Sequence, residues 1–141
     1  MNKTESIKSL AEGLILFHSK VQPIPKNGVN PFFKSKYALL GDILKAIKNP
    51  LKEADLTIAQ FPEGEHGLTT ILIHTSGEYI SSTYKLTPSK NDPQGAGSAL
   101  TYQRRYALVS ILGLDTDEDD DGAVASSNKI EHGEDNKNFK I

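Results

Sequence analysis

The chain has 141 residues, no cysteine and a net charge of −2, and 37% of its residues are hydrophobic. This length supports one domain with a core, and the lack of cysteine excludes disulfides and thiolate metal sites. No apolar run approaches the roughly 18 residues that span a membrane, and the N-terminus lacks the pattern of a signal peptide. We therefore expect an intracellular protein that does not bind membranes.

Charge is divided unevenly along the chain. Residues 1–114 carry 13 basic and 9 acidic side chains, whereas residues 115–141 carry 3 basic and 9 acidic ones. A basic body with an acidic tail indicates a polyanionic partner, with the tail competing for that partner or serving another protein. We predict a folded domain over residues 1–114 and an acidic, largely disordered tail over residues 115–141, whose composition is typical of disorder.

The first part of the chain predicts two helices joined by a loop. Apolar residues recur at helical spacing over residues 5–19 and again over residues 38–53. Prolines break any helix over residues 21–36, and Pro50 should kink the second helix or start a fresh turn. A row of lysines on the polar side of the second helix suits either a solvated face or phosphate contacts. The row consists of Lys45, Lys48 and Lys52.

The end of the loop interleaves aromatic and basic residues. Residues 30–37 read Asn-Pro-Phe-Phe-Lys-Ser-Lys-Tyr. Single-stranded nucleic acid binds to such surfaces because bases stack on aromatic rings while ammonium groups hold phosphates. We expect Phe32 and Phe33 to fill the core. Three residues could either bind nucleic acid or only face solvent: Lys34, Lys36 and Tyr37.

The hydrophobic period then changes from 3.6 to 2, which predicts strands. Strands over residues 56–61, 68–75 and 78–86, joined by short turns, predict an antiparallel meander. One face of this meander should be apolar and covered by helices, while the other carries many hydroxyl groups and could face solvent or a partner. The predicted class is α+β, in which two N-terminal helices precede a three-stranded antiparallel meander that is crossed by a long helix.

The long helix is predicted over residues 94–112. Its glycine-rich start is slim enough for a backbone to approach closely, and Gly113 suits a left-handed helix end. A helical wheel places Arg104 at the edge of the buried stripe and Arg105 about 100° further round, facing outward. Arg105 is then the better candidate for a phosphate contact, and the alternative is that both arginines form intramolecular ion pairs. The predicted buried stripe is Ala96, Leu100, Ala107 and Ile111.

An acidic run follows over residues 115–121. It lacks the spacing of a calcium loop, because the twelfth position is Asn128 and not glutamate. An alternative function is a metal-dependent nuclease that uses Asp117, Asp119 and Asp121, although such sites usually gather carboxylates from several elements. The sequence has no phosphate-binding loop of an ATPase. We predict no catalytic residue, no metal and no cofactor.

Two stretches, residues 30–40 and 95–108, are distinctive in combination. The second contains Thr-Tyr-Gln-Arg-Arg-Tyr at residues 101–106 and is followed by Leu-Gly-Leu and the acidic run. Together they resemble the ERF (essential recombination function) family, the single-strand annealing proteins of phages and prophages. The resemblance covers approximately residues 7–122.

The resemblance implies ATP-independent, sequence-independent binding and annealing of single-stranded DNA, in recombination and repair of phage DNA in the cytoplasm of a bacterial host. It also implies a β-β-β-α annealing-protein core, no enzymatic activity, and homo-oligomeric rings or filaments that hold the strand in a basic groove. A host single-strand-binding protein or a phage exonuclease could be a further partner, and an interaction module for such a protein is a second alternative function. Residue type and position, not the resemblance, give our candidate DNA-binding residues: Lys34, Lys36, Tyr37, Lys45, Lys48, Arg104 and Arg105.

Overall fold

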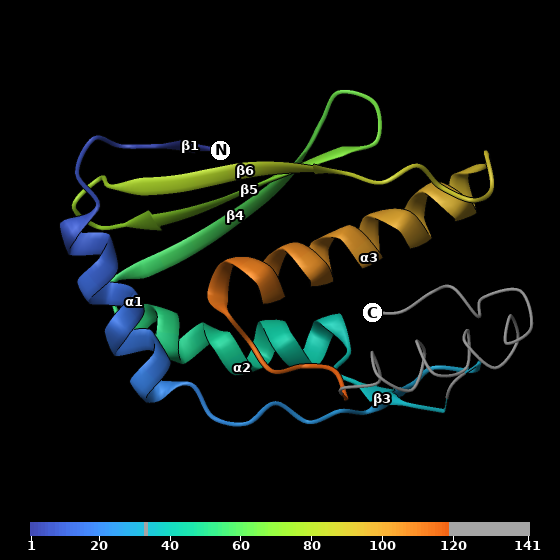
Figure 1. Ribbon diagram of the computed structural model, residues 1–141, viewed down its shortest axis with the longest axis horizontal. Helices are drawn as coiled ribbons and strands as arrows, with labels where there is room; N and C mark the ends of the chain where they lie inside the picture. Colours follow the sequence, from blue (N-terminus) through green and yellow to red (C-terminus); the bar gives the residue numbers. More distant parts are fainter. Residues whose placement is uncertain (33, 119–141) are drawn as a thin grey trace, which may run out of the picture.

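The structure is a computed structural model that describes residues 1–32 and 34–118. Within these residues, three helices lie against one side of a four-stranded antiparallel sheet, beside a small two-stranded sheet (Figure 1). The predicted α+β class with antiparallel strands is thereby confirmed. The helices are α1 (Lys8–Lys20), α2 (Leu40–Glu53) and α3 (Pro93–Leu112). The main sheet contains β1 (Asn2–Lys3), β4 (Leu56–Glu63), β5 (Gly67–His74) and β6 (Tyr79–Lys85), and the small sheet contains β2 (Gly28–Val29) and β3 (Lys36–Tyr37).

Short turns connect β4, β5 and β6, which pair in sequence order. β4 pairs with β5 as far as Glu63, which lies opposite Gly67. The turn that we predicted over residues 62–67 is therefore shorter, and β4 continues through Pro62. A proline is tolerated at this position because β4 forms the edge of the sheet.

A further strand, β1, pairs with β6 at the other side of the sheet. Asn2 lies opposite Ser81, and the backbone N–H of Thr4 donates to the carbonyl of Tyr79 over 3.1 Å. The sequence did not predict this strand. Two residues are too few to show the alternation of polar and apolar side chains on which strand prediction depends.

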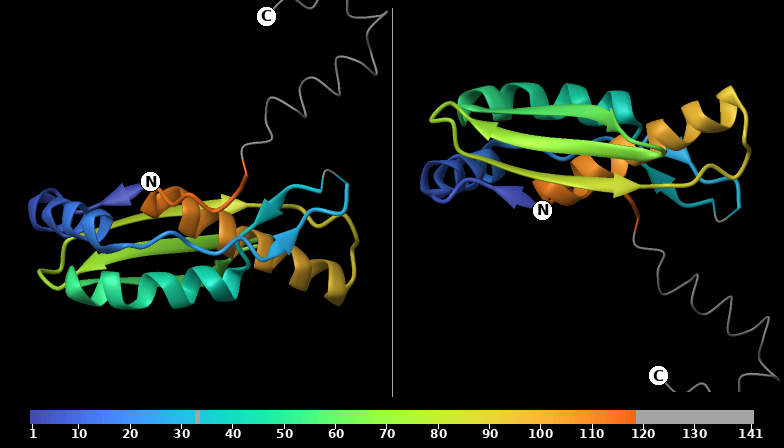
Figure 2. Two further views of the ribbon diagram at one scale, coloured as in Figure 1. Left: turned by 90° about the horizontal axis from the view of Figure 1, so that it is seen from below. Right: turned by 90° about the horizontal axis from the view of Figure 1, so that it is seen from above.

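The helices bury one face of the sheet, and the other face is open (Figure 2). Alternate side chains of β4 and β5, such as Leu56 and Leu72, point toward the helices and are buried. On the open face, the Glu63 carboxylate accepts hydrogen bonds from the hydroxyls of Thr69 and Thr83. These two bonds hold the pKa of Glu63 below its usual value. The core residues from the three helices are Leu10, Phe17, Ile43, Ile47, Leu51, Leu108 and Leu112.

α3 begins and ends at residues that suit a helix boundary. The carboxylate of Asp92 accepts a hydrogen bond from the N–H of Gly95 over 2.6 Å, and Pro93 occupies the first turn. Gly113 ends the helix in the left-handed conformation with φ of 61°, as predicted. A Cβ at Gly95 would clash with the carbonyl oxygen of Lys90. The backbone that approaches the glycine-rich start is therefore the chain's own loop.

The other two helices use features that are less visible in the sequence. The N-terminus of α1 is capped from the β5–β6 turn, where the carboxylate of Glu78 accepts the N–H of Leu10 over 2.9 Å. The C-terminus of α1 is tied to α3, because the ring of His18 donates to the carbonyl of Leu112 over 2.7 Å. α2 continues through Pro50 to Glu53 as one helix.

The buried face of α3 differs from the predicted stripe. Its buried residues are Gln103, Leu108 and Leu112, whereas Ala96 is exposed. The Gln103 side-chain amide donates to the carbonyl of His66 over 2.7 Å and to that of Tyr84 over 3.2 Å. An apolar wheel cannot find this face because its central residue is polar, and its partners are carbonyls of the β4–β5 turn and of β6, which lie far away in the sequence.

Candidate nucleic-acid interface

The predicted DNA-binding residues lie in two main regions on different sides of α3. We call the first the lysine groove, which lies between α2, β4 and α3 and is edged by Lys48, Lys52 and Arg104. We call the second the arginine–tyrosine cluster. It consists of Arg105, Tyr37, Tyr102, Tyr106 and Asp117.

The lysine groove has a volume of about 490 Å³ and an apolar floor. Side chains of α2, β4 and α3 contribute to this floor, among them Ile47, Ile58 and Leu108. The amide of Gln60 fixes α3 above β4, because it donates to the hydroxyl of Thr70 over 3.0 Å and to the carbonyl of Arg104 over 3.2 Å. These two hydrogen bonds of Gln60 therefore fix the position of Arg104 relative to β4.

The rim of the lysine groove is strongly positive. Lys48, Lys52 and Arg104 are its charged residues, and the described residues that line it include no aspartate or glutamate. Across residues 1–32 and 34–118, the lysine and arginine side chains that form ion pairs with carboxylates are those of Lys26 and Arg105, and not those of these three residues. Three cations held near one another without a counter-charge attract anions from solution.

Lys45 extends this positive edge along α2. At 100° per residue, Lys45, Lys48 and Lys52 fall within an arc of about 60° on the helix. All three are exposed. Lys52 lies in the groove although we did not include it among the DNA-binding candidates, and its place in the row with Lys45 and Lys48 was the signal that could have identified it.

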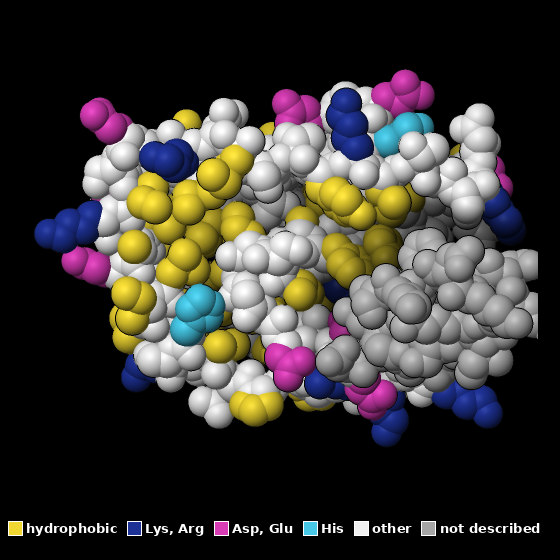
Figure 3. All heavy atoms as spheres, viewed as in Figure 1, with side chains coloured by type: hydrophobic (Ala, Val, Ile, Leu, Met, Phe, Trp, Pro, Cys, Tyr) yellow, Lys and Arg dark blue, Asp and Glu magenta, His cyan; other side chains and the backbone are white. Residues whose placement is uncertain are grey.

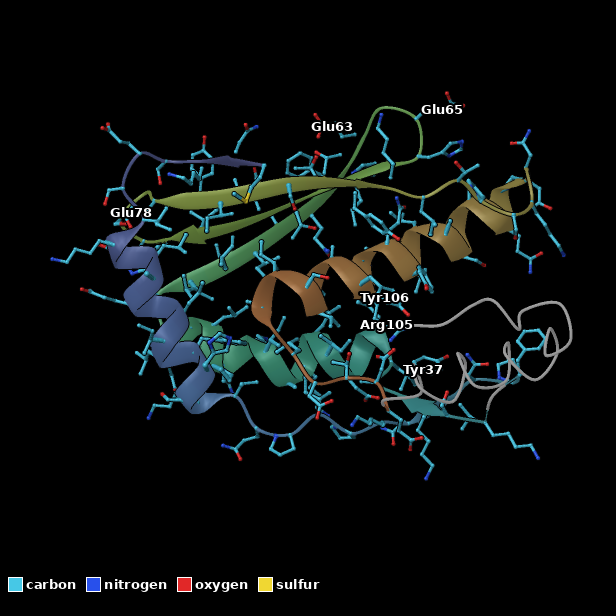
Figure 4. All side chains as sticks on the ribbon, viewed as in Figure 1. Tyr37, Glu63, Glu65, Glu78, Arg105 and Tyr106 are labelled. Carbon is cyan, nitrogen blue, oxygen red and sulfur yellow. The ribbon has the colours of Figure 1, made fainter. Side chains whose placement is uncertain are left out.

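The arginine–tyrosine cluster surrounds the guanidinium of Arg105 (Figure 4). Its carbon lies 4.6 Å from the ring centre of Tyr37 and 4.7 Å from that of Tyr106, with Tyr102 at 5.9 Å. One of its terminal nitrogens lies 2.8 Å from a carboxylate oxygen of Asp117. The side chain of Arg105 is only 11% exposed. These cation–π contacts and the charged hydrogen bond hold Arg105 inside the protein.

The two tyrosines of α3 in this cluster lie one helical turn apart. The ring centres of Tyr102 and Tyr106 are 4.2 Å apart, with an angle of 32° between the rings. Burial raises the pKa of Tyr102 to about 12, and hydrogen bonding with Tyr106 adds to the rise. The positive charge of Arg105 acts in the opposite direction, since it favours the tyrosinate.

Asp117 reaches Arg105 because the chain after α3 pairs with β3. Tyr37 and Asp117 form an antiparallel bridge. The N–H of Ala38 donates to the carbonyl of Thr116 over 2.7 Å, and the N–H of Glu118 donates to the carbonyl of Lys36 over 3.0 Å. This pairing continues to Glu118, past the domain boundary predicted at residue 114, while the remainder of the predicted tail lies outside the described residues.

The surroundings of the two arginines differ from those that the helical wheel predicted. Arg105, which was expected to face outward, is mostly buried and paired with Asp117. Arg104, which the wheel placed at the edge of the buried stripe, lines the lysine groove. The outward side of α3 is covered at Arg105 because the chain turns back after Gly113, and a helical wheel contains no information about that path.

The hairpin that joins β2 to β3 carries two further candidates, Lys34 and Lys36, and both are exposed. Our expectation that Phe32 fills the core was wrong, since this residue is 87% exposed. The N–H of Phe32 donates to the side chain of Asn30 over 2.9 Å, which fixes a tight turn at the tip of the hairpin. Phe33 lies outside the described residues.

Of the three aspartates that a metal-dependent nuclease would use, the structure describes one. Asp117 is occupied by Arg105, whereas Asp119 and Asp121 lie outside the described residues. Over residues 1–32 and 34–118, no three His, Asp or Glu side chains gather as metal ligands would. The helices of this same part of the chain include none that is long and apolar enough to cross a membrane.

Hydrophobic surface gathers in another part of the molecule. On the face shown in Figure 3, hydrophobic side chains cluster over α1 and toward the sheet, while lysines and arginines lie mainly at the periphery. Ile15 and Leu16 of α1 are among the exposed apolar residues. α1 lies at the opposite end of the molecule from β3, so this surface is separate from the arginine–tyrosine cluster (Figure 1).

Comparison with known proteins identifies the family. The model of the ERF superfamily matches residues 10–140. No curated protein and no solved structure matches the chain. Since the family match covers well over half of the sequence, the chain belongs to the ERF superfamily, as its resemblance to that family predicted. Membership supports a role in DNA recombination.

Proposed function

We propose that this member of the ERF superfamily binds single-stranded DNA without sequence preference and anneals complementary strands without ATP. The observation that carries the proposal is the lysine groove, where Lys48, Lys52 and Arg104 edge an apolar floor without an acidic neighbour among the described lining residues. An uncompensated cationic groove suits the backbone of a nucleic acid better than it suits a neutral ligand.

Sequence independence follows from what the groove offers. Its three cations contact phosphates, which are the same in every strand. The floor is formed largely by aliphatic side chains such as Ile47 and Ile58, which offer no hydrogen bonds to the edges of bases. Binding would therefore be governed by charge and shape, and the bases would stay available to pair with a second strand.

The bound strand would extend beyond the groove along other exposed cations. Lys45 continues the positive edge of α2, and Lys34 and Lys36 stand on the β2–β3 hairpin. Each contact is weak in solution, so we propose that homo-oligomers, as rings or filaments, multiply the contacts along one strand. Annealing of this kind makes and breaks no covalent bond, and the proposed mechanism needs no catalytic residue.

We further propose that the chain is divided as its charge suggests. Residues 1–114 would form the annealing domain, and the acidic residues 115–141 would modulate DNA binding or bind a protein partner such as a host single-strand-binding protein or a phage exonuclease. The net charges of the two parts, +4 and −6, support this division.

The groove is tested by removing its charges together. The variant Lys48→Gln/Lys52→Gln/Arg104→Gln should bind a labelled oligothymidylate roughly tenfold to a hundredfold more weakly in fluorescence anisotropy. Its dependence of log Kd on log salt should fall by about 2, because each lost phosphate contact removes about 0.7 for single strands. Annealing of complementary oligonucleotides without ATP should slow in parallel.

A matched control carries the same loss of charge in another place. Lys3, Lys8 and Lys20 are exposed and lie on β1 and α1, away from the groove. Their replacement by glutamine should change affinity far less than replacement of the groove residues. Equal losses in the two variants would show that only net charge matters, and an unaffected groove variant would refute the assignment of the groove.

A further inference from the structure

We propose that Asp117 takes the place at Arg105 that a DNA phosphate would occupy, so that residues 114–118 form a built-in competitor that DNA must displace. This inference rests on the proposed function, because it concerns how binding of single-stranded DNA is regulated. It assigns Arg105 and its tyrosines to a second phosphate site that is closed in the protein alone.

The first argument is chemical likeness between the carboxylate and a phosphodiester. Both present anionic oxygens to a guanidinium at the distance of a charged hydrogen bond. Asp117 does so at 2.8 Å from Arg105. Arginine favours planar groups with two oxygens, and phosphate satisfies the same donors as a carboxylate. A strand that reached Arg105 would therefore meet a position that already holds its mimic.

The second argument is the setting of Arg105. Three tyrosine rings surround it, from β3 and α3, and the residue Tyr102 is 44% exposed. Aromatic rings beside an arginine are the combination on which bases of a single strand stack. Exposed Lys36 directly precedes Tyr37 in β3, and exposed Lys34 lies in the turn before this strand. The surroundings of Arg105 thus suit a nucleic acid, but its guanidinium is already paired with Asp117.

The third argument is that the competitor is lightly attached. Residues 115–118 are joined to residues 36–38 through two backbone hydrogen bonds, one at Thr116 and one at Glu118. Their side-chain contacts are the pair of Asp115 with Lys26, the pair of Asp117 with Arg105, and a hydrogen bond from the Thr116 hydroxyl to Asp117. Thr116 is buried, whereas the side chain of Asp117 is 41% exposed and Glu118 is exposed. A segment with few buried contacts opens locally at low cost in free energy. The attachment is therefore strong enough to shield Arg105 and weak enough to be displaced.

The fourth argument is the charge of the chain beyond the contact. Residues 115–141 carry 9 acidic and 3 basic side chains. Glu118, which directly follows Asp117, is one of these acidic residues and is exposed. Release of Asp117 by DNA would also remove a negative charge from the neighbourhood of Lys36 and Tyr37.

The test compares two substitutions that remove the same charge two residues apart. Asp117→Asn removes the competitor while it keeps the shape of the side chain. Asp115→Asn breaks an ion pair with Lys26 at a residue that is 87% exposed and does not touch Arg105. Binding of labelled oligothymidylate is measured in fluorescence anisotropy at several salt concentrations, with thermal unfolding as the check that each variant folds.

The expected result is that Asp117→Asn binds about threefold to tenfold more tightly than the natural protein, while Asp115→Asn changes the affinity by less than about twofold. The salt slope should stay nearly the same, because Arg105 contacts phosphate in both bound proteins and only the cost of displacing Asp117 differs. The gain should vanish when Arg105→Gln is added. Affinity for Asp117→Asn that is no higher than for Asp115→Asn, at unchanged melting temperature, would overturn the inference.

A second measurement needs no variant. The chain has two arginines, so the side-chain Nε–Hε signals of Arg104 and Arg105 can be assigned by NMR. Saturating oligothymidylate should shift the Arg105 signal as its partner changes from Asp117 to phosphate. If only the Arg104 signal shifts, the inference fails while the proposed function stands. If the natural protein and both variants bind no single-stranded DNA, the proposed function itself fails.

Discussion

The lysine groove and the arginine–tyrosine cluster begin at consecutive residues of α3 and yet hold their positive charge in opposite ways. Arg104 faces a groove with two lysines and no acid among its described lining residues. Arg105 is enclosed by three rings and a carboxylate. A turn of about 100° between neighbours on a helix is enough to place one arginine toward an open groove and the other toward the protein. Adjacent identical residues therefore need separate functional assignments.

The largest expected effect concerns Gln103, which fixes the rotation of α3 and so keeps the two regions apart. Gln103→Leu would leave the buried carbonyls of His66 and Tyr84 without their donor. We expect the free energy of unfolding to fall by about 2 to 3 kcal/mol in urea denaturation. Gln94→Leu, the same substitution at an exposed position of α3, is the control and should cost little. Equal effects would show that Gln103 does not set the rotation.

The next largest effect is a difference in stability between the two arginines. Arg105→Gln removes a charged hydrogen bond and contacts with three rings, and should lower the free energy of unfolding by about 1 to 2 kcal/mol. Arg104→Gln should change it by less than about 0.5 kcal/mol, since its side chain lies at a solvent-facing groove. A larger loss for Arg104→Gln would reverse the comparison.

For DNA affinity we expect the reverse order, in which Arg104→Gln has a larger effect than Arg105→Gln. Arg104→Gln should weaken binding of single-stranded DNA by about threefold to tenfold, because a groove cation is available to phosphate. Arg105→Gln should weaken it less in the natural protein, because Asp117 already occupies that guanidinium. Anisotropy titrations of the two variants at one salt concentration test this order. A stronger loss for Arg105→Gln would mean that DNA displaces Asp117 at little cost.

Most of the helices and strands could be predicted from the sequence, but the contacts that distinguish the lysine groove from the arginine–tyrosine cluster could not. The helices, β4 to β6 and the end of α3 at Gly113 follow from periodicity and turn residues, which are local properties. The lysine row of α2 is local too. By contrast, the burial of Gln103 depends on carbonyls of the β4–β5 turn and of β6, which are distant in the sequence. The ion pair of Arg105 depends on how the chain returns to β3 after α3. Such contacts leave no periodic pattern.

Phe32 is a residue that we predicted to be buried and that is exposed. Its apolar side chain indicated burial, but Phe32 is 87% exposed, at the tip of the β2–β3 hairpin. The turn fixed by Asn30 directs Phe32 to solvent instead. Residue type predicts what a side chain gains when it is buried, whereas the path of the backbone decides whether it can be.

The smallest expected effect is on the pKa of Tyr102. It should again differ between the variants of the two arginines. Its pKa is raised to about 12 mainly by burial, and the charge of Arg105 opposes that rise. Because the unfolded chain loses this proton near the usual pKa of 10.0 and the folded protein keeps it, Tyr102 contributes stability below pH 10 that is lost as the pH rises toward 12. Tyr102→Phe should therefore flatten the loss of stability on the alkaline side. Arg105→Gln should raise the pKa of Tyr102 further, whereas Arg104→Gln should leave it unchanged, and tyrosinate absorbance during an alkaline titration measures both. If the two arginine variants moved this titration equally, the charge at Tyr102 would come from α3 as a whole, and the separation between its two sides would not extend to the electrostatics of the cluster.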